Sequence, residues 1–369
     1  MLHGNVGDSI LDKFSLVKPN NSFWKSKKVL ITGHTGFKGS WLSLWLLKMN
    51  SNVSGISLEQ EDSNNLFDQL KIRNDLNHIT CDIRDKELLK KHIQAIKPEI
   101  IFHLAAQPLV VASYKDPIYT WETNVMGTLH VLDAMTSINN DCLGIFITTD
   151  KVYKNNEWIY GYRENDELGG YDPYSSSKAA CEIAISSWRS SFLNSKELPS
   201  IASVRAGNVI GGGDWAENRI IPDVIRSLKN NEKIKIRNPS STRPWQHVLE
   251  PLSGYLLLAE NIYKNHQFLS SSFNFGPFIE SNKTVLELVE ECLKYWEGDY
   301  LINKGQDMPH EAGILNLSIE KAIKELHWLP KWNFQDTIAN TINWYKKVCY
   351  KEKSPIDCSL DDLNRYIQN

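Results

Sequence analysis

Hydrophobic residues in the first two hundred positions form short runs, separated by longer amphipathic stretches. The runs have the length of buried strands and lie at Lys28–Thr32, 53–57, 78–80, 100–104, 143–148 and Ile201–Arg205. Stretches with the period of a helix lie near 85–96, 117–138 and 173–192. This alternation predicts an α/β fold with a mostly parallel, doubly wound sheet of the Rossmann type.

The pattern changes after Asn208, where glycines at 211–213 interrupt the chain and the expected elements become shorter. Helices are expected near 247–264 and 284–297, with a last one at 335–348. We therefore expect a loose leader over 1–22, a Rossmann domain over 23–206 and a smaller mixed α/β substrate-binding lobe over 207–369. Elements near 247–276 are expected to return to the first domain.

The composition is that of an ordinary globular protein. Of 369 residues, 41% are hydrophobic, and 41 basic against 44 acidic side chains give a net charge of -3. Without a basic excess, a nucleic-acid partner is not expected. The six cysteines include no C-x-x-C pair, which argues against a metal site or a disulfide framework. With no signal pattern and no apolar run of about 18 residues, we expect a cytoplasmic protein without a membrane partner.

A glycine-rich turn follows the first expected strand and precedes an apolar helix. Its glycines have the spacing G-x-x-G-x-x-G. Glycines let the backbone approach a pyrophosphate closely, and the helix N-terminus offers free N–H groups and a partial positive charge. Because a strand precedes the turn and a helix follows it, the sequence predicts a dinucleotide site. Its residues are Gly33, Thr35, Gly36, Phe37, Lys38 and Gly39.

The acid that usually holds the adenosine ribose is missing from its expected place. The second strand ends at Ser57, and Glu59 follows two residues later. No arginine stands beside Ser57 in the sequence to accept a 2′-phosphate, so NAD is favoured over NADP. Asp82, after the third strand, is a candidate acceptor for the adenine amino group, and its spacing equally fits a surface aspartate in a turn.

A tyrosine and a lysine stand four residues apart on the helix that begins after Pro173. Residues at i and i+4 share a helix face, so the Lys178 ammonium is expected to favour the phenolate of Tyr174. Such a tyrosine can take a proton from a sugar hydroxyl while hydride leaves the same carbon. The fifth strand ends where ligands bind in open parallel sheets. The polar residues that follow it are Thr149, Asp150 and Lys151.

Several of these motifs resemble the extended short-chain dehydrogenase/reductases. The motifs are the glycine turn, HLAAQ at 103–107, Thr123-Asn124 and Tyr174-x-x-x-Lys178. Longer stretches are similar to the CDP-glucose branch of the nucleotide-sugar 4,6-dehydratases, namely TGHTGFKGSWLSLWL, TTDKVYKNNEWIYGYRENDELGGYDPYSSSK, VRAGNVIGGGDWAENRIIPD and RPWQHVLEPLSGYL. The likeness runs from about residue 23 to about residue 346. It implies cofactor contacts at Ser57, Asp82, Ile83, Ala105, Ala106, Gln107, Thr123, Asn124, Tyr174 and Lys178.

The resemblance implies a lyase that acts on CDP-glucose, in deoxysugar biosynthesis such as that of the lipopolysaccharide O-antigen. Such an enzyme oxidises C4 with bound NAD, removes water across C5 and C6, and returns hydride to C6. Tyr174 would be the base at the 4-hydroxyl, with Thr149 bonded to the same oxygen, and Asp150 would protonate the leaving C6 hydroxyl. Lys151, where the dTDP-glucose branch carries Glu, would act at C5 as a base or as a stabiliser of the enolate.

The second lobe is expected to hold the CDP moiety. Guanidinium groups match phosphate oxygens in a bidentate manner, and relatives place substrate contacts at several of the corresponding positions. The candidates are Asn208, Arg219, Arg237, Arg243 and Asn274.

Two other functions fit parts of the pattern. An NAD-dependent nucleotide-sugar 4-epimerase would share the fold and the Tyr–Lys pair but would not need Asp150-Lys151. A non-catalytic Rossmann protein that senses NAD would need neither the Tyr–Lys pair nor Asp150-Lys151. By analogy with relatives, a homodimer or homotetramer is expected.

Overall fold

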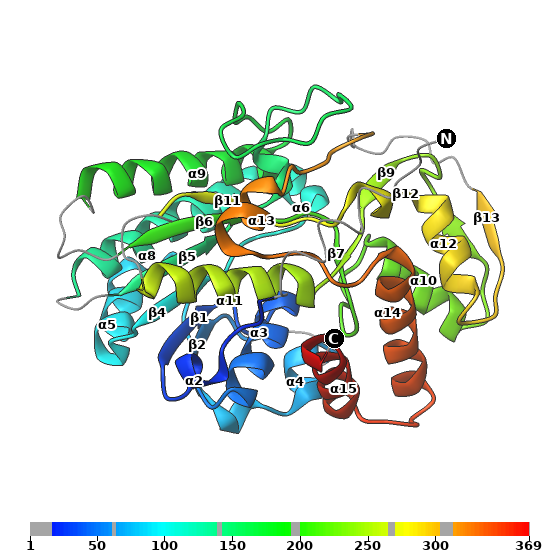
Figure 1. Cartoon of the computed structure of the whole chain (residues 1–369), viewed down its shortest axis with the longest axis horizontal. Coiled ribbons are helices and arrows are strands. Elements are labelled where there is room, and N and C mark those ends of the chain that lie inside the picture. Colours follow the sequence, from blue (N-terminus) through cyan, green and yellow to red (C-terminus); the bar gives the residue numbers. More distant parts are fainter. Residues whose placement is uncertain are drawn as a thin grey trace, which may run out of the picture.

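The structure is a computed structural model, which describes residues 17–60, 64–138, 142–192, 200–264, 270–302 and 313–368. Most of the expected leader therefore lies outside the described residues. A seven-stranded sheet crosses the molecule between two layers of helices (Figure 1).

All pairings within this sheet are parallel, and the strand order is β11-β6-β5-β4-β1-β2-β3. The strands are β1 (Lys28–Thr32), β2 (Asn52–Ser57), β3 (Asn77–Thr80), β4 (Ile100–His103), β5 (Leu143–Ile147), β6 (Ile201–Arg205) and β11 (Ser272–Asn274). The predicted α/β class and parallel, doubly wound sheet are confirmed. Each of the six expected strands begins and ends within one residue of an observed strand.

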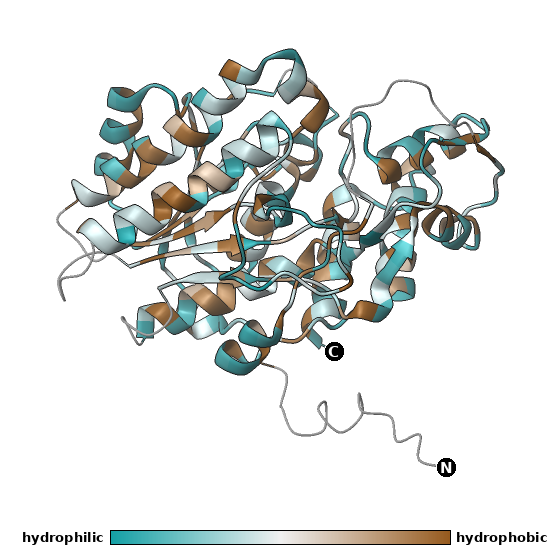
Figure 2. Ribbon diagram, turned by 90° about the horizontal axis from the view of Figure 1, so that it is seen from above, coloured by the Kyte–Doolittle hydropathy of each residue, from teal (hydrophilic) through white to brown (hydrophobic). Residues whose placement is uncertain are grey.

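The sheet separates two hydrophobic cores because successive side chains of a strand point to opposite faces. In β1, Val29 and Ile31 belong to one core and Leu30 to the other. The first core includes residues of α3 (Phe37–Lys48) and α11 (Leu249–Lys264). The second includes residues of α5 (Lys86–Ile96), α8 (Gly127–Thr136) and α9 (Pro173–Phe192). In Figure 2 the strands are mostly brown, and the helices around them carry both brown and teal residues.

The expected helix over 117–138 is interrupted. The chain forms α7 (Pro117–Trp121), then a π-helical turn, η2 (Glu122–Met126), and then α8. Such turns often occur at functional sites. Here the turn contains the predicted cofactor residues Thr123 and Asn124.

The second half of the chain contributes to both the sheet and a smaller lobe. The helix α11 packs on the sheet and β11 pairs with β6, whereas most of the other elements lie on the right in Figure 1. These elements include β7 (Val209–Ile210), α10 (Ile220–Lys229), β8 (Ile234–Ile236), β9 (Thr242–Pro244), β10 (Gln246–His247), β12 (Asn282–Thr284), α12 (Val285–Leu293), β13 (Tyr300–Ile302) and α14 (Phe334–Cys349). The division of the chain after residue 206 stays a prediction.

The expectation that the helix near 335–348 is the last one is wrong. After α14 the chain forms α15 (Pro355–Gln368), which buries Leu363 and Tyr366 against the first core. Shorter helices not expected from the sequence are α2 (Asn21–Trp24), α4 (Leu66–Leu70), η1 (Arg73–Asp75), α6 (Val110–Lys115), η3 (Asp150–Val152), η4 (Ile279–Ser281) and α13 (Glu320–Leu326).

No helix among the described residues is long and apolar enough to cross a membrane. In the same part of the chain, no group of three or more His, Cys, Asp or Glu side chains could hold a metal ion. All six cysteines are free thiols.

Candidate active site

A large cavity opens at the carboxyl ends of the strands, where the strand order reverses between β1 and β4. Ligands of open parallel sheets bind at such a switch point. The cavity has a volume of about 1580 Å³ and is lined from both halves of the chain. A single drug-sized ligand needs at most about 1000 Å³. The cavity therefore has room for a dinucleotide together with a second ligand.

The glycine turn forms one wall of this cavity, and its three glycines serve different purposes. Gly33 has a φ of 75°, and a Cβ there would lie 2.7 Å from the Ala105 nitrogen. A Cβ on Gly39 would lie 2.1 Å from the Gly33 oxygen. At Gly36 a Cβ would meet only the Gly33 oxygen, at 3.4 Å, and so would project into open space. Packing thus requires the first and third glycines, and the second leaves room for a ligand.

This turn also leads directly into the N-terminus of α3. Gly36 is the N-cap and supplies no side-chain hydrogen bond to the helix. The first N–H groups of a helix lack partners within the helix, and they attract anions. An open backbone surface beside such a helix end fits a pyrophosphate.

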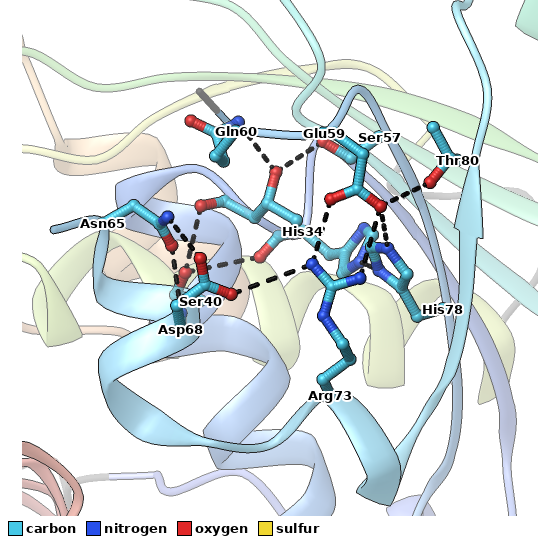
Figure 3. A network of polar contacts seen from close by, with 11 residues as sticks. His34, Ser40, Ser57, Glu59, Gln60, Asn65, Asp68, Arg73, His78 and Thr80 are labelled. Atoms are coloured by element: carbon cyan, nitrogen blue, oxygen red, sulfur yellow. Dashed lines mark hydrogen bonds and ion pairs between the residues drawn. The ribbon is translucent and has the colours of Figure 1, made fainter. Parts of the chain in front are cut away.

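Neutral polar side chains lie at the position predicted for the adenosine ribose. The Thr35 hydroxyl lies 2.5 Å from the Ser57 hydroxyl and accepts a hydrogen bond from the Gln60 amide at 3.0 Å (Figure 3). Glu59 does not line the cavity. Its carboxylate binds Arg73 instead, with hydrogen bonds of 3.0 and 3.2 Å that hold the pKa of Glu59 at about 2. A ribose in this part of the cavity would meet hydroxyl and amide groups rather than a carboxylate.

A buried histidine connects the glycine turn to this polar network. His34 Nε2 lies 2.7 Å from His78 Nδ1, and His78 in turn contacts Glu59 at 3.2 Å (Figure 3). Burial, reinforced by His78, lowers the pKa of His34 to about 4. The ring fits because Gly55 has no side chain: a Cβ there would lie 2.3 Å from the ring. His34 is therefore a neutral residue that fixes the turn on the sheet.

The other predicted cofactor residues divide into two groups. Those that line the cavity are Ser57, Asp82, Ile83, Ala105, Ala106 and Thr123. Both oxygens of Asp82 accept hydrogen bonds from the Arg84 guanidinium, the shortest at 2.6 Å. In contrast to the Asp82 oxygens, the buried Thr123 hydroxyl has no hydrogen-bond partner among the described residues.

Gln107 and Asn124 do not line the cavity, and their expected contacts with the cofactor stay predictions. The Gln107 backbone N–H donates to the Asn124 side chain at 2.8 Å, and the Asn124 amide donates to the Ser177 hydroxyl at 2.8 Å. These bonds tie the loop after β4 to α9. Both residues shape the cofactor site from behind.

Asp150 is the central carboxylate of the catalytic end. It is only 2% exposed, and its Oδ1 accepts a hydrogen bond from the Thr149 hydroxyl at 3.0 Å. Its Oδ2 is buried and has no partner among the described residues. The carboxylate fits because Gly207 has no side chain: a Cβ there would lie 1.8 Å from Oδ2. The backbone after β6 is thus shaped around this carboxylate.

Tyr174 and Lys178 lie on the first turns of α9 and line the same cavity as Asp150. Burial raises the pKa of Tyr174 to about 12, although a hydrogen bond with Thr149 opposes this shift. The Lys178 ammonium donates to the Ile147 carbonyl at 3.1 Å, and burial lowers its pKa. The five predicted catalytic residues therefore share one cavity, since Thr149 and Lys151 also line it.

The arginines expected at the nucleotide end also line the cavity, each already held in position. Arg219 binds Asp214 at 2.9 Å, and Arg237 binds Asp223 at 2.9 Å. Arg243 donates to the carbonyls of Thr242 and Gly313, at 2.9 and 3.2 Å. Asn208, which has a φ of 44°, lines the cavity beside them.

Asn274 does not line the cavity, and its expected substrate contact stays a prediction. It is fully buried, and its carbonyl accepts a hydrogen bond from the Tyr153 hydroxyl at 2.8 Å. Its amide donates to the backbone oxygens of Tyr162 and Ser318, at 2.8 and 3.2 Å. Its side-chain polar atoms join β11 to the loop after the catalytic residues and to the segment that precedes residue 320.

The sequence reasoning also missed residues that the cavity uses. Gly207 lies in the stretch VRAGNVIGGGDWAENRIIPD, but nothing in that stretch marks it as the neighbour of Asp150, which is distant in sequence. Gln60 gave no signal either, since only the fold brings it to Thr35.

A family model described as GDP-mannose 4,6 dehydratase matches residues 30–341. The chain is 46% identical over 354 residues to CDP-glucose 4,6-dehydratase of Salmonella typhimurium, which covers 94% of this chain and 98% of that protein. It is 33% identical to dTDP-D-glucose 4,6-dehydratase of Dictyostelium discoideum, over 87% of this chain and 82% of that protein.

Solved structures show the same fold in enzymes of two kinds. A dTDP-glucose 4,6-dehydratase from Streptomyces venezuelae, solved with NAD bound, has a TM-score of 0.76 at 22% identity, over 86% of this chain and 97% of that chain. A UDP-glucose 4-epimerase from Thermotoga maritima has a TM-score of 0.74 at 20% identity, over 87% and 99%. The fold alone therefore does not separate dehydration from epimerisation.

Proposed function

We propose that this chain, which belongs to the GDP-mannose 4,6 dehydratase family within the extended short-chain dehydrogenase/reductases, converts CDP-glucose to CDP-4-keto-6-deoxyglucose. The observation that carries the proposal is the buried Asp150 carboxylate, which shares a cavity with the Tyr174–Lys178 pair. The choice of CDP-glucose is supported by the 46% identity with the Salmonella enzyme over nearly the whole of both chains.

NAD is the cofactor in this proposal. The open side of Gly36 and the free end of α3 fit its pyrophosphate, and Thr35 and Ser57 offer hydroxyls to its ribose. When bound, NAD accepts hydride from C4 of the sugar and returns it to C6. Its oxidised ring also carries a positive charge.

Tyr174 is proposed to take the proton of the sugar 4-hydroxyl. In the free protein burial keeps this phenol protonated at neutral pH, because its pKa is about 12. Positive charge near a phenol favours the phenolate, and here it comes from Lys178 and from the oxidised cofactor. Thr149, already bonded to Tyr174, would orient the same sugar oxygen.

Asp150 is proposed to give a proton to the departing C6 hydroxyl. Its Oδ2 atom, which has no partner within the described part of the chain, is the atom that would carry this proton. Lys151 lines the cavity next to it and would act at C5, either as the base or as a charge that stabilises the enolate. An epimerase needs no such pair, so these residues favour dehydration.

The CDP diphosphate is proposed to bind Arg219, Arg237 and Arg243, with Asn208 beside them. Each guanidinium has an acceptor that holds it in place, which lowers the entropic cost of ordering it around a ligand. Guanidinium groups bind phosphate oxygens in bidentate pairs.

Incubation of the purified protein with NAD and a panel of sugar nucleotides tests the proposal. We expect CDP-glucose to lose one water, as measured by mass spectrometry, and dTDP-glucose, UDP-glucose and GDP-mannose to react more slowly. A product of unchanged mass with inverted C4 would indicate an epimerase. No reaction with any sugar, despite NAD binding, would indicate a non-catalytic NAD-binding protein.

A homo-oligomer is also proposed. Four apolar side chains on α7, η2 and α9 are at least 41% exposed, namely Ile118, Trp121, Met126 and Ile183. Clustered apolar groups of this kind are typical of protein interfaces. Light scattering coupled to gel filtration would give the mass, and a monomeric mass would contradict the proposal.

A further inference from the structure

We propose that the Lys38 side chain binds the diphosphate of the sugar nucleotide and so links the cofactor site to the substrate site. The inference rests on the function proposed above and concerns a residue that sequence reasoning placed with the cofactor. Lys38 is the second residue of α3, whose first backbone N–H groups are proposed to bind the dinucleotide.

The direction of Lys38 follows from the packing of α3. Trp41 lies three residues later, and its indole N–H donates to the Gly212 carbonyl at 3.0 Å. Residues three apart in a helix share a face, so Lys38 and Trp41 both point toward the segment over 207–219. Lys38 also lines the cavity. The ammonium therefore lies on the substrate side of the turn.

The charges that act on Lys38 agree with this position. They are Asp150, Arg219 and Lys178, which belong to the proposed acid, the nucleotide end and the Tyr–Lys pair. Burial, together with the two cations, lowers the pKa of Lys38 to about 8, although Asp150 opposes this shift. The ammonium is thus placed among groups from both proposed ligand sites.

Within the described residues, Lys38 makes no hydrogen bond or ion pair, unlike Arg219 and Arg237, which each bind a carboxylate. The Lys38 side chain is half-buried at the cavity wall, and its ammonium is not among the buried polar atoms that lack a partner. A cation that faces a cavity in this way can bind an anionic ligand there, and the proposed anion on the Arg219 side is the diphosphate of the sugar nucleotide. The pyrophosphate of the dinucleotide has the glycine turn and the helix end as its own partners.

The position of Lys38 has a consequence for binding. Two diphosphates in one cavity repel each other, and a cation between them offsets the repulsion. The effect of each ligand on the other must be reciprocal. Loss of the Lys38 charge should therefore weaken the binding of the sugar nucleotide. It should also make each bound ligand reduce the affinity of the protein for the other.

Isothermal titration calorimetry with CDP and NAD tests the inference, each measured alone and in the presence of the other. For Lys38→Met we expect the CDP affinity to fall about tenfold or more, as for a lost charged hydrogen bond. The affinity of this variant for NAD alone should stay within about threefold of the parent value. Once CDP is present, the variant should bind NAD more weakly than it does alone. Lys38→Arg, which keeps the charge, should bind CDP close to the parent value.

Lys154→Met is the matched control, because Lys154 lines the same cavity but pairs with Glu167 at 3.0 Å. It removes the same charge and should change CDP affinity little. The inference is overturned if Lys38→Met binds CDP with the affinity of the parent, or if its affinity for NAD alone falls as much as its affinity for CDP. It is also overturned if Lys154→Met lowers the CDP affinity as much as Lys38→Met does. A parent protein that binds NAD but not CDP would instead overturn the proposed substrate, and this inference with it.

Discussion

Replacing Gly207 with alanine would put a methyl group where the Asp150 carboxylate now lies. The added Cβ would be 1.8 Å from Oδ2 and 2.2 Å from Cγ of Asp150. Even a tight contact of 3.0 Å requires the carboxylate to move by 1.2 Å, the difference between 3.0 and 1.8 Å. Misplacement of a catalytic group by about 1 Å can cost about 100-fold in rate. We therefore expect Gly207→Ala to slow elimination about 100-fold.

Oxidation at C4 depends on Tyr174, and the three atoms nearest to the added Cβ all belong to Asp150, so this step should largely survive. Rapid-quench mass analysis with absorbance of the reduced cofactor would follow both steps. The variant should accumulate reduced cofactor and a 4-keto sugar that keeps its C6 hydroxyl. Asp150→Asn, which cannot deliver a proton, should stall at the same point.

Gly276→Ala provides the control for the general effect of replacing a glycine. A Cβ there would lie 3.5 Å from its nearest neighbours, an ordinary van der Waals distance. This variant should turn over at the parent rate. If Gly207→Ala eliminates water at the parent rate, or loses oxidation and elimination equally, the assignment of Asp150 as the acid is wrong.

Three further predictions concern the cofactor, the base and pH. Gly36→Val should prevent NAD binding, because its side chain would fill the open side of the turn, and purified variant that still carries stoichiometric NAD would exclude the turn as the site. Tyr174→Phe should bind NAD but lose hydride transfer by about 100-fold or more in single-turnover assays, and near-normal turnover would remove Tyr174 from the mechanism. Burial raises the pKa of Glu250 from 4.5 to about 7, so the folded protein holds a proton that the unfolded chain releases. The free energy of unfolding should therefore fall as pH rises between these values, and Glu250→Gln should show a flatter dependence in urea titrations. Identical profiles for parent and variant would contradict this reasoning.

The elements that sequence reasoning located correctly are those with a strong local signal. A continuous apolar run marks β1, and the spacing of Gly33, Gly36 and Gly39 marks the turn that follows it. The pair Tyr174 and Lys178 was recognisable because a helix brings residues four apart to one face. Each of these inferences needs only neighbours along the chain.

The inferences that the sequence could not resolve depended on contacts between distant residues. Asn274 and Asn124 are both polar residues within motifs. The sequence alone cannot tell whether such a side chain bonds to a ligand or to another residue, as Asn274 does to Tyr153 and Asn124 to Ser177. The helix α15 was missed because its buried side chains include polar ones such as Asp362, which weakens the hydrophobic period.

The parallel pairing of β11 with β6 affects how the chain can be made. The strand β6 ends at Arg205, and its partner begins at Ser272, so the sheet remains incomplete until the chain has been synthesised well beyond the catalytic residues. Until then the edge of β6 is unpaired, and unpaired edges are sites of aggregation. A protein truncated near residue 206 would expose this edge permanently. During synthesis, the first half of the chain must therefore stay soluble until β11 has been made and pairs with β6.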